Sequence, residues 1–166
     1  ICRQHLWRRL GARGDADSAF ETVITHYRSD TRAYHTTRHL EECLEQFDQV
    51  RERIRRPDEV EAAIWFHDAI YDPHASDNEE RSADLADRLL GRAGVPTEYL
   101  AEIRRLVLAT GHRGARDPQD DAAVMTDIDL AIFGSDPERF DEYERDIRRE
   151  YAFVPEDQFR RRRAEI

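Results

Sequence analysis

The 166-residue chain contains no lysine, so arginine supplies all 26 of its basic side chains, and we infer no function from this bias. Cysteine is also scarce, since only Cys2 and Cys43 are present. Two cysteines argue against a disulfide framework and favour a reducing compartment, so we expect a cytoplasmic protein. The longest apolar runs are about ten residues, well short of a membrane span, and no secretory signal is visible. The sequence therefore predicts no membrane partner.

Basic residues are outnumbered by acidic ones, 26 against 36, which gives a formal net charge of −10. This balance argues against non-specific nucleic-acid binding, which depends on a positive surface. The run Arg160–Arg163 after Phe159 is more typical of a solvated helix face than of a nucleic-acid contact. We therefore expect no nucleic-acid partner, while the oligomeric state stays open.

The length of the chain fits one domain over residues 1–166. The sequence begins at Ile1 rather than Met and stops at Ile166 within a charged helical pattern, so we expect the natural chain to be slightly longer at both ends.

Proline and glycine punctuate the sequence, and the segments between them have an apolar period of about 3.6 residues. The string Ser135-Asp136-Pro137-Glu138 combines a cap, a proline at the first helical position and an acidic first turn, as expected where a helix begins. Alternating β-branched runs, which would indicate strands, are absent. We expect an all-α, single-domain helical bundle, with helices near 2–11, 15–29, 35–55, 58–71, 78–91, 96–110, 120–133, 137–150 and 156–166.

The pair His67-Asp68 lies within the apolar run 62–71. At helical spacing, His67 occupies the middle of a core-facing stripe. Ionisable groups are costly to bury unless they are paired, hydrogen-bonded or bound to a metal. The pair therefore indicates either a hydrogen-bonded pair that only stabilises the core or a cation site.

Two further segments place ionisable groups where a helix should be apolar. In the first, His35 and His39 are four residues apart, so we expect them to share a face near the start of a helix. The second, 122–133, is apolar nearly all round and so predicted to be buried, yet it carries Asp127 and Asp129.

Together these segments supply two imidazoles and two carboxylates, a mixed nitrogen and oxygen donor set. Such a set suits one divalent ion with open water positions: Mn, Fe, Ni, Co or Mg, with Zn also compatible. A closed structural zinc site would need thiolates, and Cys43 alone cannot supply them.

The order His39, His67-Asp68, Asp129 resembles the HD superfamily of metal-dependent phosphohydrolases, in which a His, a His-Asp doublet and a distal Asp from separate helices bind one metal. Further strings are similar to a branch of uncharacterised bacterial HD proteins. They are Tyr34-His35, Arg38-His39-Leu40, Trp65-Phe66-His67-Asp68, Tyr71-Asp72-Pro73, Asp77-Asn78-Glu79-Glu80, Ser82-Ala83, Asp127-Ile128-Asp129-Leu130, Gly134 and Ile147-Arg148-Arg149-Glu150-Tyr151. The resemblance covers the chain from about residue 20 to its end. It implies an HD-type fold and the metal ligands His39, His67, Asp68 and Asp129, with Asp129 preferred over Asp127.

The resemblance also implies an activity, hydrolysis of a small phosphate ester, of which a nucleotide is one candidate. Asp68 would orient or deprotonate the attacking water. Leaving-group protonation is assigned to His35, His112 or Glu79, and neutralisation of phosphate charge to Arg38 and Arg113.

Two alternatives to a phosphohydrolase are open. HD relatives with two irons are oxygenases and place extra histidines between the doublet and the distal Asp, where this chain has His74 and His112. The other alternative is a non-catalytic binding protein that keeps its metal only for stability.

Overall fold

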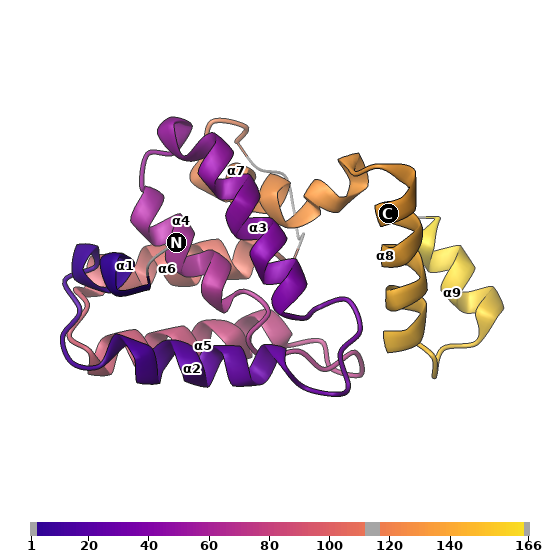
Figure 1. Cartoon of the computed structure of the whole chain (residues 1–166), viewed down its shortest axis with the longest axis horizontal. Helices are drawn as coiled ribbons and strands as arrows, with labels where there is room; N and C mark the ends of the chain where they lie inside the picture. The colour runs from indigo at the N-terminus through magenta and orange to yellow at the C-terminus, as the bar shows by residue number, and fades with distance from the viewer. Residues whose placement is uncertain (1–2, 112–116, 165–166) are drawn as a thin grey trace.

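Helices make up the regular structure of residues 3–111 and 117–164, the ranges that the computed structural model describes (Figure 1). These ranges contain no strand, so the predicted all-α fold is confirmed. The α-helices are α1 (Arg3–Arg9), α2 (Ala16–Tyr27), α3 (Thr37–Val50), α4 (Pro57–Phe66), α5 (Asn78–Arg92), α6 (Thr97–Ala109), α7 (Asp121–Asp129), α8 (Pro137–Glu150) and α9 (Glu156–Arg163). Two 3-10 turns, η1 (Arg51–Arg53) and η2 (Leu130–Gly134), continue α3 and α7.

Local sequence signals explain where these helices begin and end. The side chains of Thr36, Asp120 and Asp136 accept backbone N–H groups at the starts of α3, α7 and α8. Helix α5 ends at Arg92, and two residues later the chain turns at Gly94, whose φ of 81° a residue with a side chain rarely adopts. The amide of Val95 then donates to the carbonyl of Leu90, which closes the helix end.

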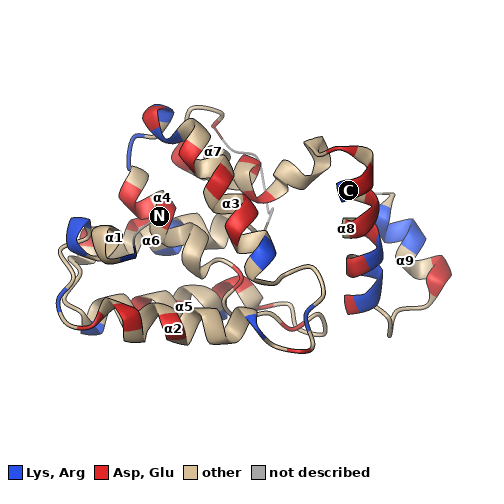
Figure 2. Cartoon of the chain, viewed as in Figure 1, with Lys and Arg blue, Asp and Glu red and all other residues tan. Residues whose placement is uncertain are grey.

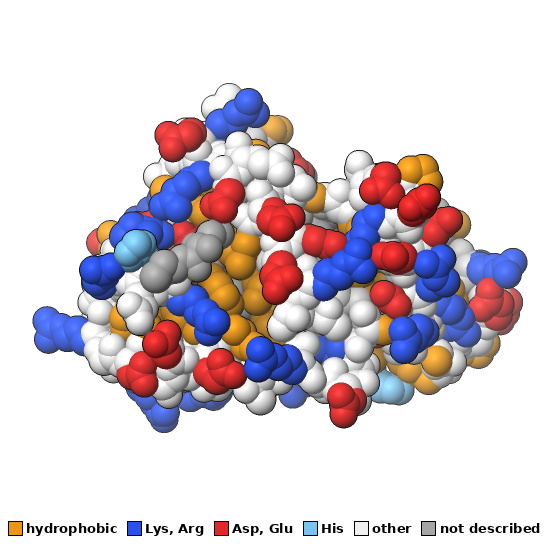
Figure 3. All heavy atoms as spheres, in the orientation of Figure 1, with side chains coloured by type: hydrophobic (Ala, Val, Ile, Leu, Met, Phe, Trp, Pro, Cys, Tyr) orange, Lys and Arg blue, Asp and Glu red, His pale blue; other side chains and the backbone are white. Residues whose placement is uncertain are grey.

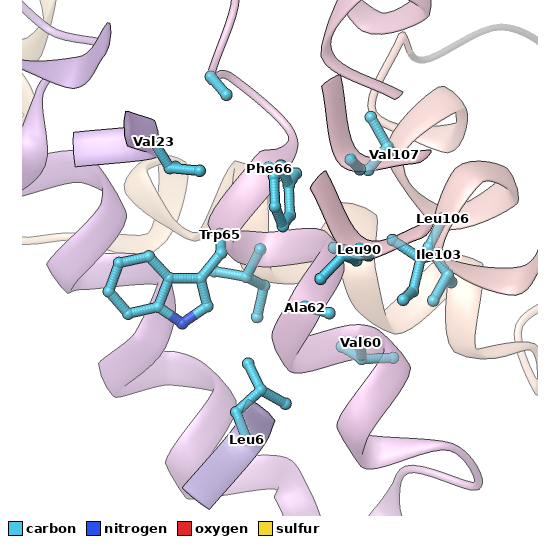
Figure 4. Packing of buried hydrophobic residues seen from close by; sticks show 14 of the residues in the cluster. Leu6, Val23, Val60, Ala62, Trp65, Phe66, Leu90, Ile103, Leu106 and Val107 are labelled. Carbon is cyan, nitrogen blue, oxygen red and sulfur yellow. The ribbon is translucent and has the colours of Figure 1, made fainter. Parts of the chain in front are cut away.

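Helix α4 lies at the centre of the main core. It packs against α1, α3, α5, α6 and α7. Figure 4 shows Leu90, Ile103 and Leu106 on one side of α4, with Leu6 and Val23 on the other. All five side chains are at most 1% exposed. The end of α4 is therefore held in place from several directions, and it carries the His-Asp pair.

Helices α8 and α9 form a pair beside this body (Figure 1). Their contact with it is a smaller apolar cluster, in which Tyr143 and Ile147 of α8 meet Tyr34 and Ile132. Acidic and basic side chains both lie along α8, and basic side chains occupy the last turn of α9 (Figure 2). This pair of helices therefore covers the loop before α3 and the segment after α7.

Several predicted helix ends are wrong by a few residues, and two of them affect the position of the predicted site residues. Helix α3 begins at Thr37 rather than at residue 35, so His35 lies before the helix and not on its face. Helix α4 ends at Phe66 rather than at 71, so His67 and Asp68 follow its last turn. Helix α4 stops because the amides that would continue it donate elsewhere: the amide of Asp68 to the Tyr27 hydroxyl at 3.3 Å and the amide of Ile70 to Ser82 Oγ at 3.0 Å.

The surface in Figure 3 mixes acidic and basic side chains without a large field of one sign. Apolar side chains gather on this face between α2 and α3, where Ile24, Leu40, Leu44 and Trp65 border a shallow hollow. Within the described ranges, every helix is too short or too polar to span a bilayer.

Candidate metal centre

Four side chains from separate parts of the sequence meet beside the end of α4. The Nε2 atoms of His39 and His67 are 3.1 Å apart. Asp68 Oδ2 lies 3.4 and 3.2 Å from these two nitrogens, and Asp129 Oδ1 lies 3.3 and 3.5 Å from them. Helix α3 thus contributes one imidazole, the end of α4 contributes an imidazole and a carboxylate, and α7 contributes the second carboxylate.

These separations fit the spacing of ligands around one ion. Ligand atoms about 2.1 Å from a metal lie about 3.0 Å apart at neighbouring octahedral positions and about 3.4 Å apart in a tetrahedron. The five measured separations run from 3.1 to 3.5 Å. The residues present therefore fit a divalent cation without rearrangement.

The hydrogen bonds around His67 favour metal binding at Nε2. Its other ring nitrogen, Nδ1, lies 2.8 Å from the carbonyl oxygen of Ile64, which can only accept a hydrogen bond. The proton of the neutral ring is therefore fixed on Nδ1, and Nε2 presents its lone pair to the cluster, as outer-shell partners of metal-binding histidines commonly ensure. The ring is 1% exposed, so no water competes for this arrangement.

Electrostatics in the cluster favour a positive charge among the four groups. Burial opposes protonation of the imidazoles, but Cys43, Asp129 and Asp68 beside His39 outweigh it, and its pKa is raised well above the usual range. The pKa of His67 is raised in the same way, chiefly by Asp68. Burial likewise opposes ionisation of Asp68, yet the adjacent histidines lower its pKa well below the usual range. Because the two Nε2 atoms nearly touch, one shared proton is favoured and a second is opposed by like-charge repulsion.

Cys43 is a neighbour of this centre that the sequence did not predict. Its sulfur lies 3.7 Å from His39 Nε2, and His39, Cys43, His67 and Asp129 form a group that could hold a metal ion. Cys43 is one turn after His39 on α3, so the spacing that placed the two histidines could also have placed this thiol. The donor set thus has two candidates for its fourth member, Asp68 and Cys43.

A cavity of about 460 Å³ opens beside the cluster, and Asp68 and Asp129 are part of its wall. Their side chains are 18% and 14% exposed, whereas those of His39 and His67 are 2% and 1% exposed. The imidazoles therefore lie behind the carboxylates. The remaining wall combines polar groups from α5 and the loop before α3 with apolar side chains from η2, α8 and α9.

The chain matches no protein-family model, no curated protein and no solved structure.

The other predicted site residues divide into three groups. His35 and Glu79 line the cavity together with Asp68. Arg38 does not, because it is exposed on α3 and pairs with Glu42 and with Glu142 of α8 at 3.2 and 2.9 Å. His112 and Arg113 lie outside the described residues. Asp127 is exposed and is not part of the donor group, while Asp129 contacts both histidines.

His74, the other histidine considered for a second metal, is exposed and stacks on Phe153 with ring centroids 3.7 Å apart. The structure places it outside the His39, Cys43, His67 and Asp129 group. Within the described residues, no second group of donors is found.

Two residues that organise the centre were not predicted from the sequence. Arg32 donates to the carbonyl of His35 at 2.9 Å as well as to the two carbonyls after His67, so it joins the loop before α3 to the end of α4. Tyr27 accepts a hydrogen bond from the amide of Asp68 at 3.3 Å. Contacts between residues so far apart in the sequence leave no local signal from which they could be predicted.

Proposed function

We propose that this chain is a metal-dependent phosphohydrolase of the HD type that acts on small phosphate esters. The observation that carries this proposal is the position of the donor cluster at the wall of a cavity. Catalytic metal sites keep an open position, whereas structural sites are closed by protein ligands. Here Asp68 and Asp129 separate the buried imidazoles from the cavity, so an ion held by the four side chains could face it.

A divalent ion held at this place would polarise a phosphate oxygen and acidify a water molecule. Asp68 has a partly exposed carboxylate at the cavity wall and is positioned to orient the attacking water. His35, on the same wall, is the candidate proton donor to the leaving oxygen, with Glu79 as the alternative.

Arginines from α9 take the role that the sequence assigned to Arg38. Arg162 and Arg163 both line the cavity. Arg163 is paired with Glu144 and lies over the ring of Tyr143, so these two contacts already compensate much of its positive charge. Arg162 is exposed and has no ion pair within the described part of the chain. We assign phosphate binding to Arg162, because a free guanidinium matches phosphate geometry.

The cavity limits the substrate class. Its volume of about 460 Å³ suits a small molecule rather than a polymer. The net charge of −10 also disfavours long polyanions. The wall formed by Phe133, Ile147 and Phe159 is apolar, so the esterified group of the substrate has a nonpolar face to contact. Small phosphomonoesters, nucleotides among them, satisfy these conditions.

The test uses protein stripped of metal and reloaded with Mn, Co or Ni. It is assayed on a panel of phosphomonoesters, phosphodiesters and nucleotides. We expect metal-dependent hydrolysis of monoesters that His67→Ala and Asp68→Ala abolish and that Asp127→Asn, a matched change at an exposed carboxylate, preserves.

Other outcomes favour the alternatives. Stoichiometric metal without turnover of any ester would favour a binding protein stabilised by its metal. Two irons per chain, with an absorbance change in air, would favour the oxygenase.

A further inference from the structure

Glu150, the last residue of α8, is a buried carboxylate to which the proposed hydrolysis assigns no role. Its side chain is 0% exposed. A buried carboxylate is costly unless hydrogen bonds compensate for its lost hydration. The bonds that Glu150 accepts all come from two segments of the cavity wall, the loop 33–35 and Tyr71.

The two carboxylate oxygens of Glu150 have different partners. Oε1 accepts the backbone amides of Ala33, Tyr34 and His35 at 2.7, 2.8 and 3.1 Å. Oε2 accepts the Tyr71 hydroxyl at 2.9 Å and lies 2.6 Å from Nδ1 of His35. The contacts of Oε1 alone would anchor the loop to α8. The contacts of Oε2 go further, because they fix side chains that line the cavity.

These contacts fix the backbone of His35, one nitrogen of its ring and one face of the ring. Its amide bonds to Glu150, its carbonyl accepts from Arg32 at 2.9 Å, and its ring stacks on Tyr71 with centroids 4.0 Å apart. Since an ionised carboxylate can only accept, Nδ1 must carry a proton. Within the described residues no hydrogen bond engages Nε2, so this nitrogen is the one that can serve a ligand in the cavity.

We propose that Glu150 is a positioning residue that fixes His35 with Nδ1 protonated, so that Nε2 delivers a proton to the leaving oxygen of the phosphoester. This inference rests on the proposed function. Water forms a new P–O bond while the ester P–O bond breaks. The leaving oxygen takes the proton from Nε2 of the doubly protonated ring, which becomes the neutral form with its proton on Nδ1, and the proton released by the attacking water returns to Nε2 through solvent. Glu150 stabilises the positive ring and its orientation throughout, as a buried carboxylate does for a histidine proton carrier.

The decisive variant is Glu150→Gln in the full chain loaded with Mn. Its amide oxygen can keep the loop contacts of Oε1, while its NH₂ group replaces an acceptor by a donor facing His35 Nδ1. The control is Glu138→Gln, the same chemical change at an exposed position of α8. Two substrates are compared: an alkyl phosphate, whose leaving oxygen needs a proton, and 4-nitrophenyl phosphate, whose leaving group departs without one.

We expect Glu150→Gln to lower kcat on the alkyl ester by about a hundredfold, the low end of general acid catalysis, and on the nitrophenyl ester by less than about threefold. His35→Ala should show the same split, and it keeps the test open if Glu150→Gln does not fold. A second readout is ¹⁵N NMR of the histidine rings in metal-free protein, where the Nδ1-protonated form of His35 should be lost in Glu150→Gln.

The positioning role would be overturned if Glu150→Gln lowered kcat equally on both esters, or on neither, and the NMR signal of His35 stayed unchanged. Such a result would not contradict the proposed phosphohydrolase activity. The wild-type protein failing to hydrolyse either ester would instead defeat the proposed function, and the proton-delivery role with it.

Discussion

Asp129 and Asp127 lie two residues apart on α7, and the structure predicts opposite consequences for the same substitution. Asp129 Oδ1 is within 3.5 Å of both imidazole nitrogens, whereas Asp127 is exposed. Asp129→Asn replaces one of the four candidate metal ligands, a carboxylate, by a neutral amide of nearly the same shape. We therefore expect it to abolish the stabilisation that metal gives, while Asp127→Asn leaves that stabilisation intact.

The size of the effect follows from linkage. A ligand that binds only the folded state adds about 2.7 kcal/mol when its free concentration is a hundredfold above Kd. For a chain of this length, about 2–4 °C of Tm accompanies each kcal/mol, so metal should raise Tm by roughly 5–11 °C. In metal-free protein, Asp129→Asn should cost little, because it removes a carboxylate from a cluster that already holds Asp68.

The assay is thermal unfolding in EDTA and in excess Mn or Zn for wild type and both variants. A metal-dependent rise in Tm that survives in Asp129→Asn, or that disappears in Asp127→Asn, would refute the assignment. The absence of any rise in the wild type would refute the metal centre itself.

Three further predictions concern the groups around the centre. Arg32→Ala leaves three carbonyl oxygens without their donor and should destabilise the fold by about 3 kcal/mol in urea unfolding, and Arg32→Lys should recover less than half of this because an ammonium lacks the fork. Burial opposes ionisation of Glu150, but hydrogen bonds from His35 and the loop amides lower its pKa from 4.5 to about 2. The ionised Glu150 carboxylate therefore stabilises the fold by about 3 kcal/mol above pH 4.5, and this stabilisation is lost as the pH falls toward 2. The free energies of unfolding of wild type and Glu150→Gln should then converge at low pH. If Asp68 completes the donor set, Cys43→Ser should retain one metal per chain, whereas loss of metal would assign the fourth ligand to Cys43.

The helices could be predicted from the sequence because their signals are local. The cap at Asp136 and the glycine at position 94 act within one turn, and the apolar period identifies the buried faces. The end of α4 could not be predicted in this way. It depends on Tyr27 and Ser82, which accept the amides of Asp68 and Ile70 from 41 and 12 positions away, and a helical pattern contains no record of such contacts.

The candidate centre shows the same division. Ionisable residues within apolar helices identified His39, His67, Asp68 and Asp129, because burial is costly enough to leave a pattern. Arg162 and Glu150 left no such pattern. They lie on charged helices whose sequences resemble any solvated face, and only the packing of α8 and α9 brings Arg162 to the cavity wall and Glu150 to His35. Arg38 shows the opposite failure: it is next to His39 in the sequence, yet it does not line the cavity.

Anomalous diffraction from crystals grown with Mn tests the central claim most directly. We predict one peak per chain, about 2.0–2.4 Å from Nε2 of His39 and His67 and from the carboxylates of Asp68 and Asp129, with open positions facing the cavity. Full-occupancy metal at another place, or no peak among these four side chains in metal-saturated crystals, would contradict it.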